Sequence, residues 1–348
     1  MITVNETQCK AIAERLRRQN IRPDEFLFIP NSIDEMMREA NYWIFVIAIC
    51  QHTKSLQGRI DGTWCRGWDY LVRATRRVVD EVGSAEAMAA LDATRLRAIL
   101  SDHFDPDSSS VDRIEERLAQ LHGVAEELLA GYEGQAMNAY CHAGGHLRGV
   151  GGIFERLGKI PHFADPLEKK AQLLVAQLDA EGVWPLEDPE NLKVCMDYHA
   201  MRVALRTGIV EVTDPGLLIA LKQKARVSDE INHQVRRVVS DACDRLVVLS
   251  GVSVFEFDKW IWHLGRSCCF YDHEPICGPR TCHKMDICTY IKAVDYACPG
   301  KCSLDGACKG SRDDFYKAFW ETNVYTEYYL SQIGPFFGER SNLMYRSF

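Results

Sequence analysis

The stretch CMDYHAMRVALRTG, residues 195–208, places one aspartate, one tyrosine, one histidine and two arginines in an otherwise apolar helical pattern. Asp197 directly follows an apolar run, where a carboxylate is costly to bury unless a hydrogen bond or a cation stabilises it. The unpaired backbone amides at the start of a helix can provide such stabilisation. The pattern therefore indicates either a helix-capping aspartate or a carboxylate that is fixed in place for chemistry.

The cysteines are the second set of residues that could do chemistry. Eight of the 14 cysteines fall between residues 268 and 308. Thiols stay reduced in the cytoplasm, so metal or iron–sulfur ligation is a better interpretation of this cluster than disulfides. Four of them are separated by seven, four and five residues, and thiolates this close in the chain can bind one iron–sulfur cubane or one tetrahedral zinc ion. These four are Cys269, Cys277, Cys282 and Cys288.

Three further cysteines, Cys298, Cys302 and Cys308, follow the quartet. Together with Cys268 or His283 they form a candidate second metal site. One of them could instead replace a ligand of the quartet. Free buried thiols are the remaining interpretation, because an unmodified cysteine behaves as a small apolar residue.

The sequence around the quartet resembles the iron–sulfur loop of the endonuclease III and adenine-glycosylase branch of the helix-hairpin-helix DNA glycosylases. That loop reads Gly-Arg-x-x-Cys, then Pro-x-Cys, then two more cysteines, with an acidic and an aliphatic residue before the last. The family's gaps are six, two and five residues. The resemblance implies a [4Fe–4S] cluster in the loop 265–308, with structural zinc as the alternative. The matching residues are Gly265, Arg266, Cys269, Pro275, Cys277, Cys282, Asp286, Ile287 and Cys288.

The opening stretch is similar to a segment that in this superfamily reads Val-Asp-Thr-His-Val-x-Arg-x-x-x-Arg. Asp197 aligns with the catalytic carboxylate, and Tyr198 replaces the usual threonine, as in the archaeal 8-oxoguanine branch. Breaking an N-glycosidic bond builds positive charge on the sugar, which a fixed anion stabilises. By the same resemblance His199 and Arg202 are expected to contact DNA, and Arg206 holds the last position of the motif.

Residues 153–178, IFERLGKIPHFADPLEKKAQLLVAQL, have the shape of a helix-hairpin-helix. The backbone amides of such a hairpin bind phosphate without reading the base sequence. The family's hairpin usually contains Leu-Pro-Gly-Val-Gly, and both glycines are missing here. The residues expected at the DNA are those of the turn, Ile160, Pro161, His162 and Phe163.

In bifunctional family members, a lysine two residues before an alanine begins the second helix and attacks the sugar. The sequence KKAQLL aligns Lys169 with that nucleophile and leaves Lys170 as the alternate. Desolvation lowers the pKa of a lysine, which is what a nucleophilic amine requires. Two solvated helix lysines are the other interpretation.

The stretch FVIAICQHTKS, residues 45–55, resembles the helix and turn that fill the gap left by a flipped base. Gln51 holds the wedge position and His52 lies beside it. Aromatic candidates for stacking on the base are Trp64, Trp68 and Tyr140, although core packing explains them equally well.

The elements that must hold these residues are helical, because apolar residues recur at three- and four-residue spacing from residue 6 to about residue 260. The longest apolar run, YWIFVIAIC at 42–50, is shorter than the roughly 20 residues that cross a bilayer, and predicts a core helix. We expect an all-α, two-lobed fold. One lobe, 41–190, contains the wedge and hairpin, and residues 1–40 with 191–348 form the other.

The composition is that of a globular protein, and the formal net charge of −8 argues against a uniformly basic surface while allowing a local basic face. The N-terminal segment lacks an apolar signal core, so we expect a cytoplasmic monomer without membrane spans. The resemblance implies that its partner is double-stranded DNA and that its function is excision of a damaged or modified base, in repair or in defence against phage.

The base and the class of activity stay open. For the base, an oxidised purine is the first expectation, and a hypermodified pyrimidine of phage DNA is the alternative, because insertions at 54–68 and 99–112 would widen the pocket. For the activity, the alternatives are a DNA-binding member of the family without catalysis and a hydrolase of modified nucleosides or RNA.

Overall fold

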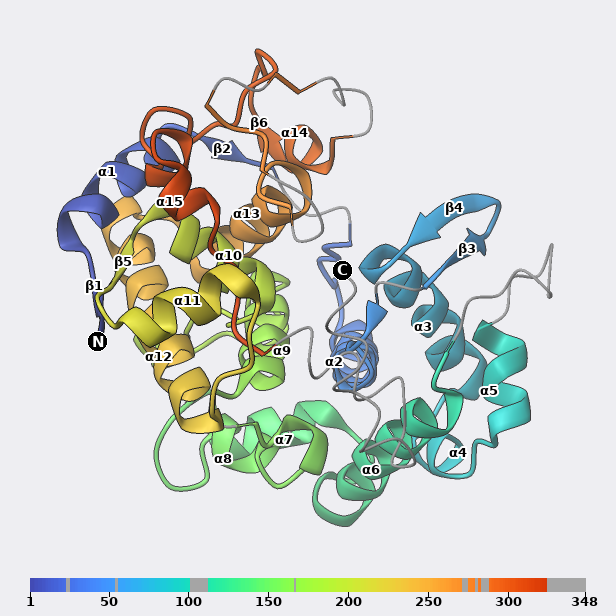
Figure 1. Cartoon of the computed structure of the whole chain (residues 1–348). Helices are drawn as coiled ribbons and strands as arrows, with labels where there is room; N and C mark the ends of the chain where they lie inside the picture. The colour runs from blue at the N-terminus through green and yellow to red at the C-terminus, as the bar shows by residue number, and fades with distance from the viewer. Residues whose placement is uncertain are drawn as a thin grey trace, which may run out of the picture. The chain divides into compact units, whose positions relative to one another are not determined.

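The structure is a computed structural model that describes residues 1–22, 26–53, 56–100, 112–165, 167–270, 275–278, 281–282 and 288–323. These residues are mostly helical, and three two-stranded antiparallel sheets accompany the helices (Figure 1). The chain divides into two compact units. The first unit contains residues 1–22 and the chain from residue 196 onward, and the second contains residues 23–195.

The two units and the two expected lobes have different boundaries. The sequence predicts boundaries after residues 40 and 190, whereas the compact units have theirs after residues 22 and 195. Residues 23–40 belong to the second unit because helix α2, Ile33–Ala48, begins in this stretch and packs along α3 and α9. A boundary at residue 41 would divide that helix.

The second unit is built around α2. Its residues 42–48 are at most 3% exposed, so the C-terminal part of the helix is buried on all sides, as its continuous apolar run predicts, whereas Ile33 at its start is 73% exposed. The core helix expected from residues 42–50 is therefore confirmed. The elements around it are β3 (Gln57–Ile60), β4 (Thr63–Arg66), α3 (Trp68–Val82), α4 (Ala85–Ala89), α5 (Ala93–Leu100), α6 (Ile114–Tyr132), α7 (Ala136–Ala143), α8 (Ile153–Leu157), the 3-10 helix η3 (Pro161–Phe163), α9 (Lys169–Ala180) and η4 (Pro189–Asn191).

The first unit joins the N-terminal segment to the C-terminal half of the chain. Strand β1 pairs with β5 and β2 pairs with β6, so two short sheets tie the first 22 residues to later segments. Helix α1 packs on α12, and α10 packs between α12 and α13. The elements are β1 (Ile2–Val4), α1 (Glu6–Arg17), β2 (Asn20–Ile21), α10 (Tyr198–Thr207), β5 (Val210–Val212), α11 (Pro215–Gln223), α12 (Asp229–Ser250), α13 (Val254–Ser267), α14 (Thr289–Ala293), β6 (Val294–Asp295), η6 (Lys309–Ser311) and α15 (Asp314–Lys317).

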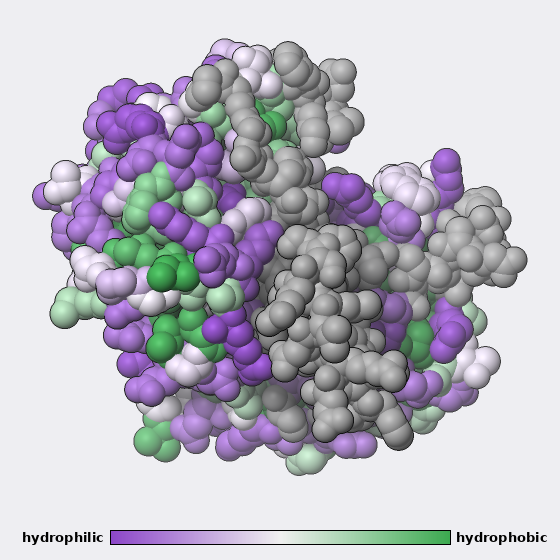
Figure 2. Space-filling model, in the orientation of Figure 1, coloured by the Kyte–Doolittle hydropathy of each residue, from purple (hydrophilic) through white to green (hydrophobic). Residues whose placement is uncertain are grey.

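The three sheets are an addition to the all-helical fold that the sequence predicts. Each has strands of two to four residues, too short to give a clear alternating pattern. The described surface in Figure 2 is mostly hydrophilic, with apolar residues in small groups. Within the described residues, no helix has the length and apolar character needed to cross a membrane.

Candidate functional site

Asp197 lies at the N-cap of α10. Its Oδ1 accepts a hydrogen bond of 2.7 Å from the backbone N–H of Ala200, and its own backbone is extended. The side chain is half-buried, so the carboxylate is fixed by the first turn of the helix and still reaches the surface. Asp197 is thus a capping residue by geometry. This does not conflict with a catalytic role, because the cap determines where the anion is held.

Arg202 and His199, which the resemblance assigns to DNA contact, lie in the core of the first unit. Arg202 is fully buried and His199 is 2% exposed. The guanidinium of Arg202 donates to the carbonyl of Cys269 at 2.9 Å and forms an ion pair of 3.0 Å with Glu321, and it contacts His199 Nδ1 at 2.9 Å. We therefore correct the expectation: these side chains link α10 to later segments, and they cannot reach DNA from this position.

Gly265 allows the close packing of α13 on α10. A Cβ atom at this position would lie 2.7 Å from His199 Nδ1 and 2.8 Å from its Cβ. The second contact involves an atom next to the backbone, which cannot rotate away. The glycine of the Gly-Arg-x-x-Cys motif is thus required by helix packing in this chain.

Arg206, one helical turn after Arg202, connects α10 to the cysteines. It is 2% exposed and donates to the carbonyl of Phe319 at 2.7 Å and of Phe270 at 2.9 Å. Its Nη1 also lies 3.5 Å from the Cys269 sulfur. Its Nη2 is buried and has no hydrogen-bond partner in the part of the chain that the structure describes. A buried guanidinium keeps its charge, so it favours anionic groups beside it.

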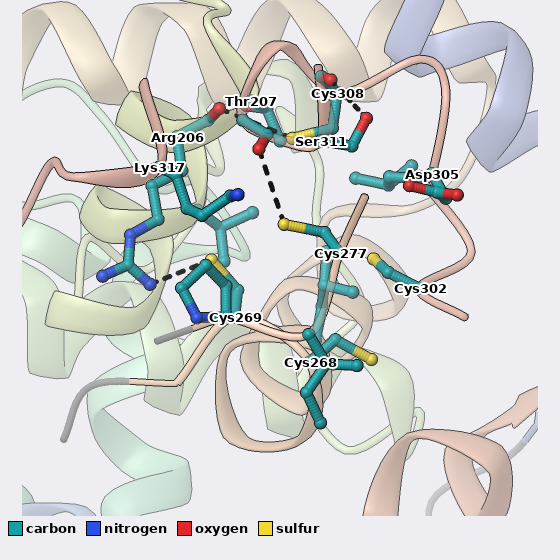
Figure 3. A pocket seen from close by; sticks show the side chains of 16 residues that line it. Arg206, Thr207, Cys268, Cys269, Cys277, Cys302, Asp305, Cys308, Ser311 and Lys317 are labelled. Atoms are coloured by element: carbon teal, nitrogen blue, oxygen red, sulfur yellow. Dashed lines mark hydrogen bonds between the residues drawn. The ribbon is translucent and has the colours of Figure 1, made fainter. Parts of the chain in front are cut away.

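Five thiols line a single pocket in the first unit, which we call the thiol pocket (Figure 3). The pocket has a cavity of about 30 Å³, so the side chains do not fill the space between them. Arg206 and Lys317 also line it. The thiols come from two stretches of the chain, 268–277 and 302–308, and belong to Cys268, Cys269, Cys277, Cys302 and Cys308.

The thiol pocket divides the predicted quartet. Cys269 and Cys277 line it, whereas Cys282 and Cys288 are not among its lining residues. The backbone N–H of Cys282 donates to the carbonyl of Gly300 at 2.7 Å, and Cys288 precedes α14. Cys302 and Cys308, which the sequence assigns to a candidate second site, line the thiol pocket together with Cys269. The structure does not bring Cys298 into the pocket either.

Three of the pocket thiols have raised pKa values. Burial and the neighbouring Cys269 raise the pKa of Cys277 to about 12. Burial and the neighbouring Cys302 raise the pKa of Cys308 well above the ordinary value for a thiol. A hydrogen bond with Cys268, followed by burial, does the same to the pKa of Cys302. Such thiols become thiolate ligands when the positive charge of a metal replaces the proton.

The residues of the thiol pocket suit either group that the sequence indicates, because thiolates bind both a tetrahedral zinc ion and an iron–sulfur cubane. Among the described residues, no three histidine, cysteine, aspartate or glutamate side chains are already placed to hold one ion.

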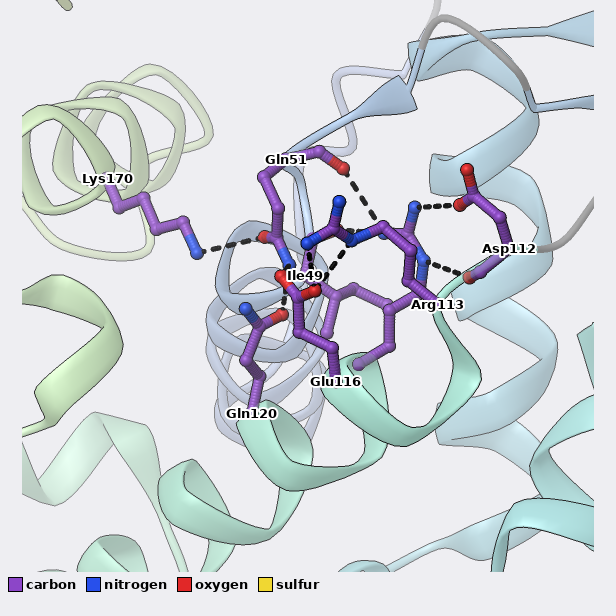
Figure 4. A network of polar contacts seen from close by, with 8 residues as sticks. Ile49, Gln51, Asp112, Arg113, Glu116, Gln120 and Lys170 are labelled. Carbon is purple, nitrogen blue, oxygen red and sulfur yellow. Dashed lines mark hydrogen bonds and ion pairs between the residues drawn. The ribbon is translucent and has the colours of Figure 1, made fainter. Parts of the chain in front are cut away.

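In the second unit, Gln51 takes part in a polar network, shown in Figure 4. Its side-chain amide donates to Gln120 and, at 3.3 Å, to Glu116, and its Oε1 accepts from Lys170 Nζ at 3.1 Å. The neighbouring His52 has a left-handed backbone, with φ of 52°. Burial, with the charge of Arg113 next, lowers the pKa of His52. As a wedge, Gln51 would have to leave these partners.

The two adjacent lysines have different surroundings. Lys170 Nζ donates to the carbonyl of Ala48, at the end of α2, at 2.5 Å as well as to Gln51. Burial lowers the pKa of Lys170. Lys169 is the first residue of α9, its side chain is half-buried, and its carbonyl accepts from the thiol of Cys195 at 3.5 Å. Lys170 therefore joins two helices, and Lys169 is the lysine at the start of the helix.

The predicted helix-hairpin-helix contains α8, η3 and α9, and η3 begins at Pro161. Ile160 and Phe163 are each 1% exposed, so their side chains anchor the turn in the core. The expected contact of this turn with DNA is made by its backbone amides, and it stays a prediction. His162 is half-buried, and its pKa is lowered by burial and then by Lys170. Phosphate contact here would depend on the backbone of the turn.

The three aromatic candidates for base stacking differ in their packing and exposure. Trp68 stacks on Trp43 with ring centroids 6.3 Å apart, and Tyr140 stacks on Trp184 at 5.8 Å. Both are half-buried packing residues. Trp64, on β4, is 56% exposed.

Two features of the site were not expected from the sequence: the buried partner of Arg202, Glu321, and the pairing of Cys302 and Cys308 with Cys269. A carboxylate within the aromatic segment 315–330 was the available signal for Glu321. In comparisons with known proteins, no family model and no curated protein matches this chain.

Proposed function

We propose that the protein is a DNA glycosylase that flips a damaged or modified base out of double-stranded DNA and cleaves its N-glycosidic bond. The observation that carries the proposal is the placement of Asp197. Its half-buried carboxylate is fixed by Ala200, and the same helix is anchored by Arg202 and Arg206 beside the thiol pocket. A rigidly held, accessible anion is what stabilisation of a cationic sugar requires.

In the proposed reaction, the base leaves with the electron pair of the bond between its nitrogen and C1′. Positive charge develops on the sugar, and Asp197 stays ionised and stabilises it. A water molecule then adds to C1′ and releases a proton to solvent, which leaves an abasic site. The helix N-terminus around Asp197 favours the ionised carboxylate that this step needs.

Lys169 offers a second route. A neutral amine at this position would attack C1′ as the base leaves, and loss of a proton with opening of the sugar ring would give an imine. Lys169 begins α9, whereas Lys170 is held by Ala48 and Gln51. We therefore assign the nucleophile of this route to Lys169 and a structural role to Lys170.

The thiol pocket is the proposed site of a [4Fe–4S] cluster, with zinc as the alternative. When bound, the cluster would join three segments of the first unit and hold α10 in place. We infer that four of the five pocket cysteines are the ligands, and that Cys269 is among them rather than Cys268, because the guanidinium of Arg206 lies 3.5 Å from the Cys269 sulfur and can offset the charge of a thiolate there. The four are Cys269, Cys277, Cys302 and Cys308.

The test is release of bases from DNA, identified by mass spectrometry, on a panel that includes oxidised DNA and phage DNA with modified cytosines. Asp197→Asn should lower the rate about 10²-fold or more, because it removes the charge that stabilises the sugar. Asparagine is as good an N-cap as aspartate, so the variant keeps the helix start. Turnover close to that of the wild type would contradict the assignment of Asp197.

The same reactions, run with borohydride, separate the two routes. Lys169→Gln should abolish covalent trapping of the protein on DNA, and Lys170→Gln, its matched control, should keep it. A protein that cleaves its substrate without trapping uses water. Release of bases only from RNA or from free nucleosides would assign the site to a nucleoside hydrolase, and binding without any release would indicate a silent DNA-binding protein.

A further inference from the structure

One face of the hairpin β3–β4 is exposed along its whole length, and we call it the exposed hairpin face. In the sheet register, Gln57 lies opposite Arg66 and Arg59 opposite Trp64, so the four side chains share one side of the ribbon. All four are exposed. The other side carries the buried residues Gly58, Ile60 and Cys65 and packs on α3.

Trp64 is unusual in this position. It is 56% exposed, although a tryptophan normally buries its large ring. Exposed tryptophan and arginine on one surface are typical of binding sites rather than of ordinary solvent-facing residues.

The charge of the face is positive. It carries Arg59 and Arg66 and no carboxylate. The acidic residue of the turn, Asp61, is paired with Arg77 of α3 at 2.5 Å. Figure 2 shows hydrophilic and intermediate residues over this hairpin, without an apolar patch. In a chain of net charge −8, such a face is complementary to an anionic partner and a poor match for an apolar one.

Both ends of the hairpin β3–β4 lie close to the turn that contains Gln51. The N–H of Leu56 donates to the carbonyl of Thr53 at 3.0 Å, and the N–H of Gly67 donates to the carbonyl of Leu56 at 2.7 Å. Gly67 has φ of 61° and ψ of −129°, a conformation that favours glycine. Both ends of the ribbon are thus fixed next to the predicted wedge within the second unit.

We propose that the exposed hairpin face binds the DNA strand next to the base pair that Gln51 opens. Arg59 and Arg66 contact backbone phosphates, and the ring of Trp64 stacks on a base that has lost its neighbour. This inference rests on the proposed function, because it takes DNA with an opened base pair as the ligand. It adds a second contact region, outside the hairpin of residues 153–178.

The experiment measures binding of the full chain to a short duplex that contains a tetrahydrofuran abasic-site analogue, at several salt concentrations. The double variant Arg59→Ala/Arg66→Ala should reduce the slope of log Kd against log salt by about 2, because two phosphate contacts are lost. Trp64→Ala should weaken binding about tenfold and leave the slope unchanged, because stacking is not ionic. Trp64→Phe should restore most of the affinity.

Thr63→Ala is the matched control, because Thr63 is exposed in the same hairpin but lies outside the exposed hairpin face. It should bind as the wild type does. Wild-type affinity and slope in the Trp64→Ala and double-arginine variants would overturn the proposal. If these variants bind less tightly but the wild type releases no base, the hairpin contact stands and the glycosylase proposal falls. If the wild type binds no duplex, both fall.

Discussion

The two units bury charge in different ways. In the first unit the buried cations are Arg202 and Arg206, whose guanidinium groups stay charged at any physiological pH. In the second unit Arg117 is also fully buried and permanently charged, and the unit further contains Lys170 and Glu181, whose pKa values are shifted by burial toward the neutral form. Both units therefore hold a permanent internal charge, and the second also holds charges that respond to pH.

The difference between Arg206 and Glu181 agrees with the groups that surround each side chain. Arg206 lies beside the Cys269 sulfur, and thiolate ligands carry negative charge that a permanent cation offsets. Glu181 accepts from Trp43 Nε1 and Gln177, which are neutral donors, so nothing there requires an anion.

The strongest test of this comparison concerns the proposed cluster. A cluster in the thiol pocket predicts a brown, iron-containing protein, and Cys302→Ser should remove both the colour and the iron, because it deletes a proposed ligand. Cys282→Ser, outside the pocket, should retain both. Iron analysis and visible absorbance measure the difference. Loss of iron in Cys282→Ser alone would favour the ligand quartet that the sequence predicts. A colourless wild-type protein with one bound zinc ion would show that the pocket binds zinc and not a cluster.

The next largest effect concerns the buried ion pair of the first unit. Arg202→Met would leave Glu321 buried without its cation, which typically destabilises a protein by about 3–5 kcal/mol. Urea unfolding of this variant measures the loss. The double variant Arg202→Met/Glu321→Gln should recover part of it, because neither charge is then buried alone. If Arg202→Met lowers the free energy of unfolding no more than the loss of an exposed ion pair does, the result would contradict a permanent buried charge at Arg202.

The smallest effect concerns pH and the second unit. Burial raises the pKa of Glu181 from 4.5 to about 7, so the folded state binds its proton more tightly than the unfolded state does. The resulting stabilisation is complete below pH ~4.5 and is lost as the pH rises through ~7, by about 2–3 kcal/mol. Glu181→Gln cannot ionise, so its urea midpoint should fall less than that of the wild type between mildly acidic and mildly alkaline pH. Parallel curves for the two proteins would mean that Glu181 does not titrate in this range.

Local sequence patterns predicted the helices well, because helix formation depends on neighbouring residues. The core helix at 42–50 and the cap at Asp197 are examples. The ribbon β3–β4 was not predicted, although Asp61–Gly62 is a common hairpin turn, because its strands have only four residues each.

The site was harder to predict because its contacts join distant segments. Arg202 has the spacing of a surface residue in a motif, and its burial depends on Glu321, 119 residues later. The grouping of Cys302 with Cys269 depends on how α13 and the segment after β6 meet, and neither sequence spacing nor composition encodes that. Of the four cysteines that the spacing grouped, Cys269 and Cys277 line the thiol pocket, whereas Cys282 and Cys288 do not.

The pairing of β1 with β5 and of β2 with β6 has a consequence for how the chain is made. Residues 1–22 leave the ribosome first, and their partners at 210–212 and 294–295 leave it much later. The second unit, which is continuous from residue 23 to 195, can fold during that interval. The amino-terminal segment must meanwhile wait unpaired, so the first unit closes, and its cysteines come together, only when synthesis has passed the last of these strands.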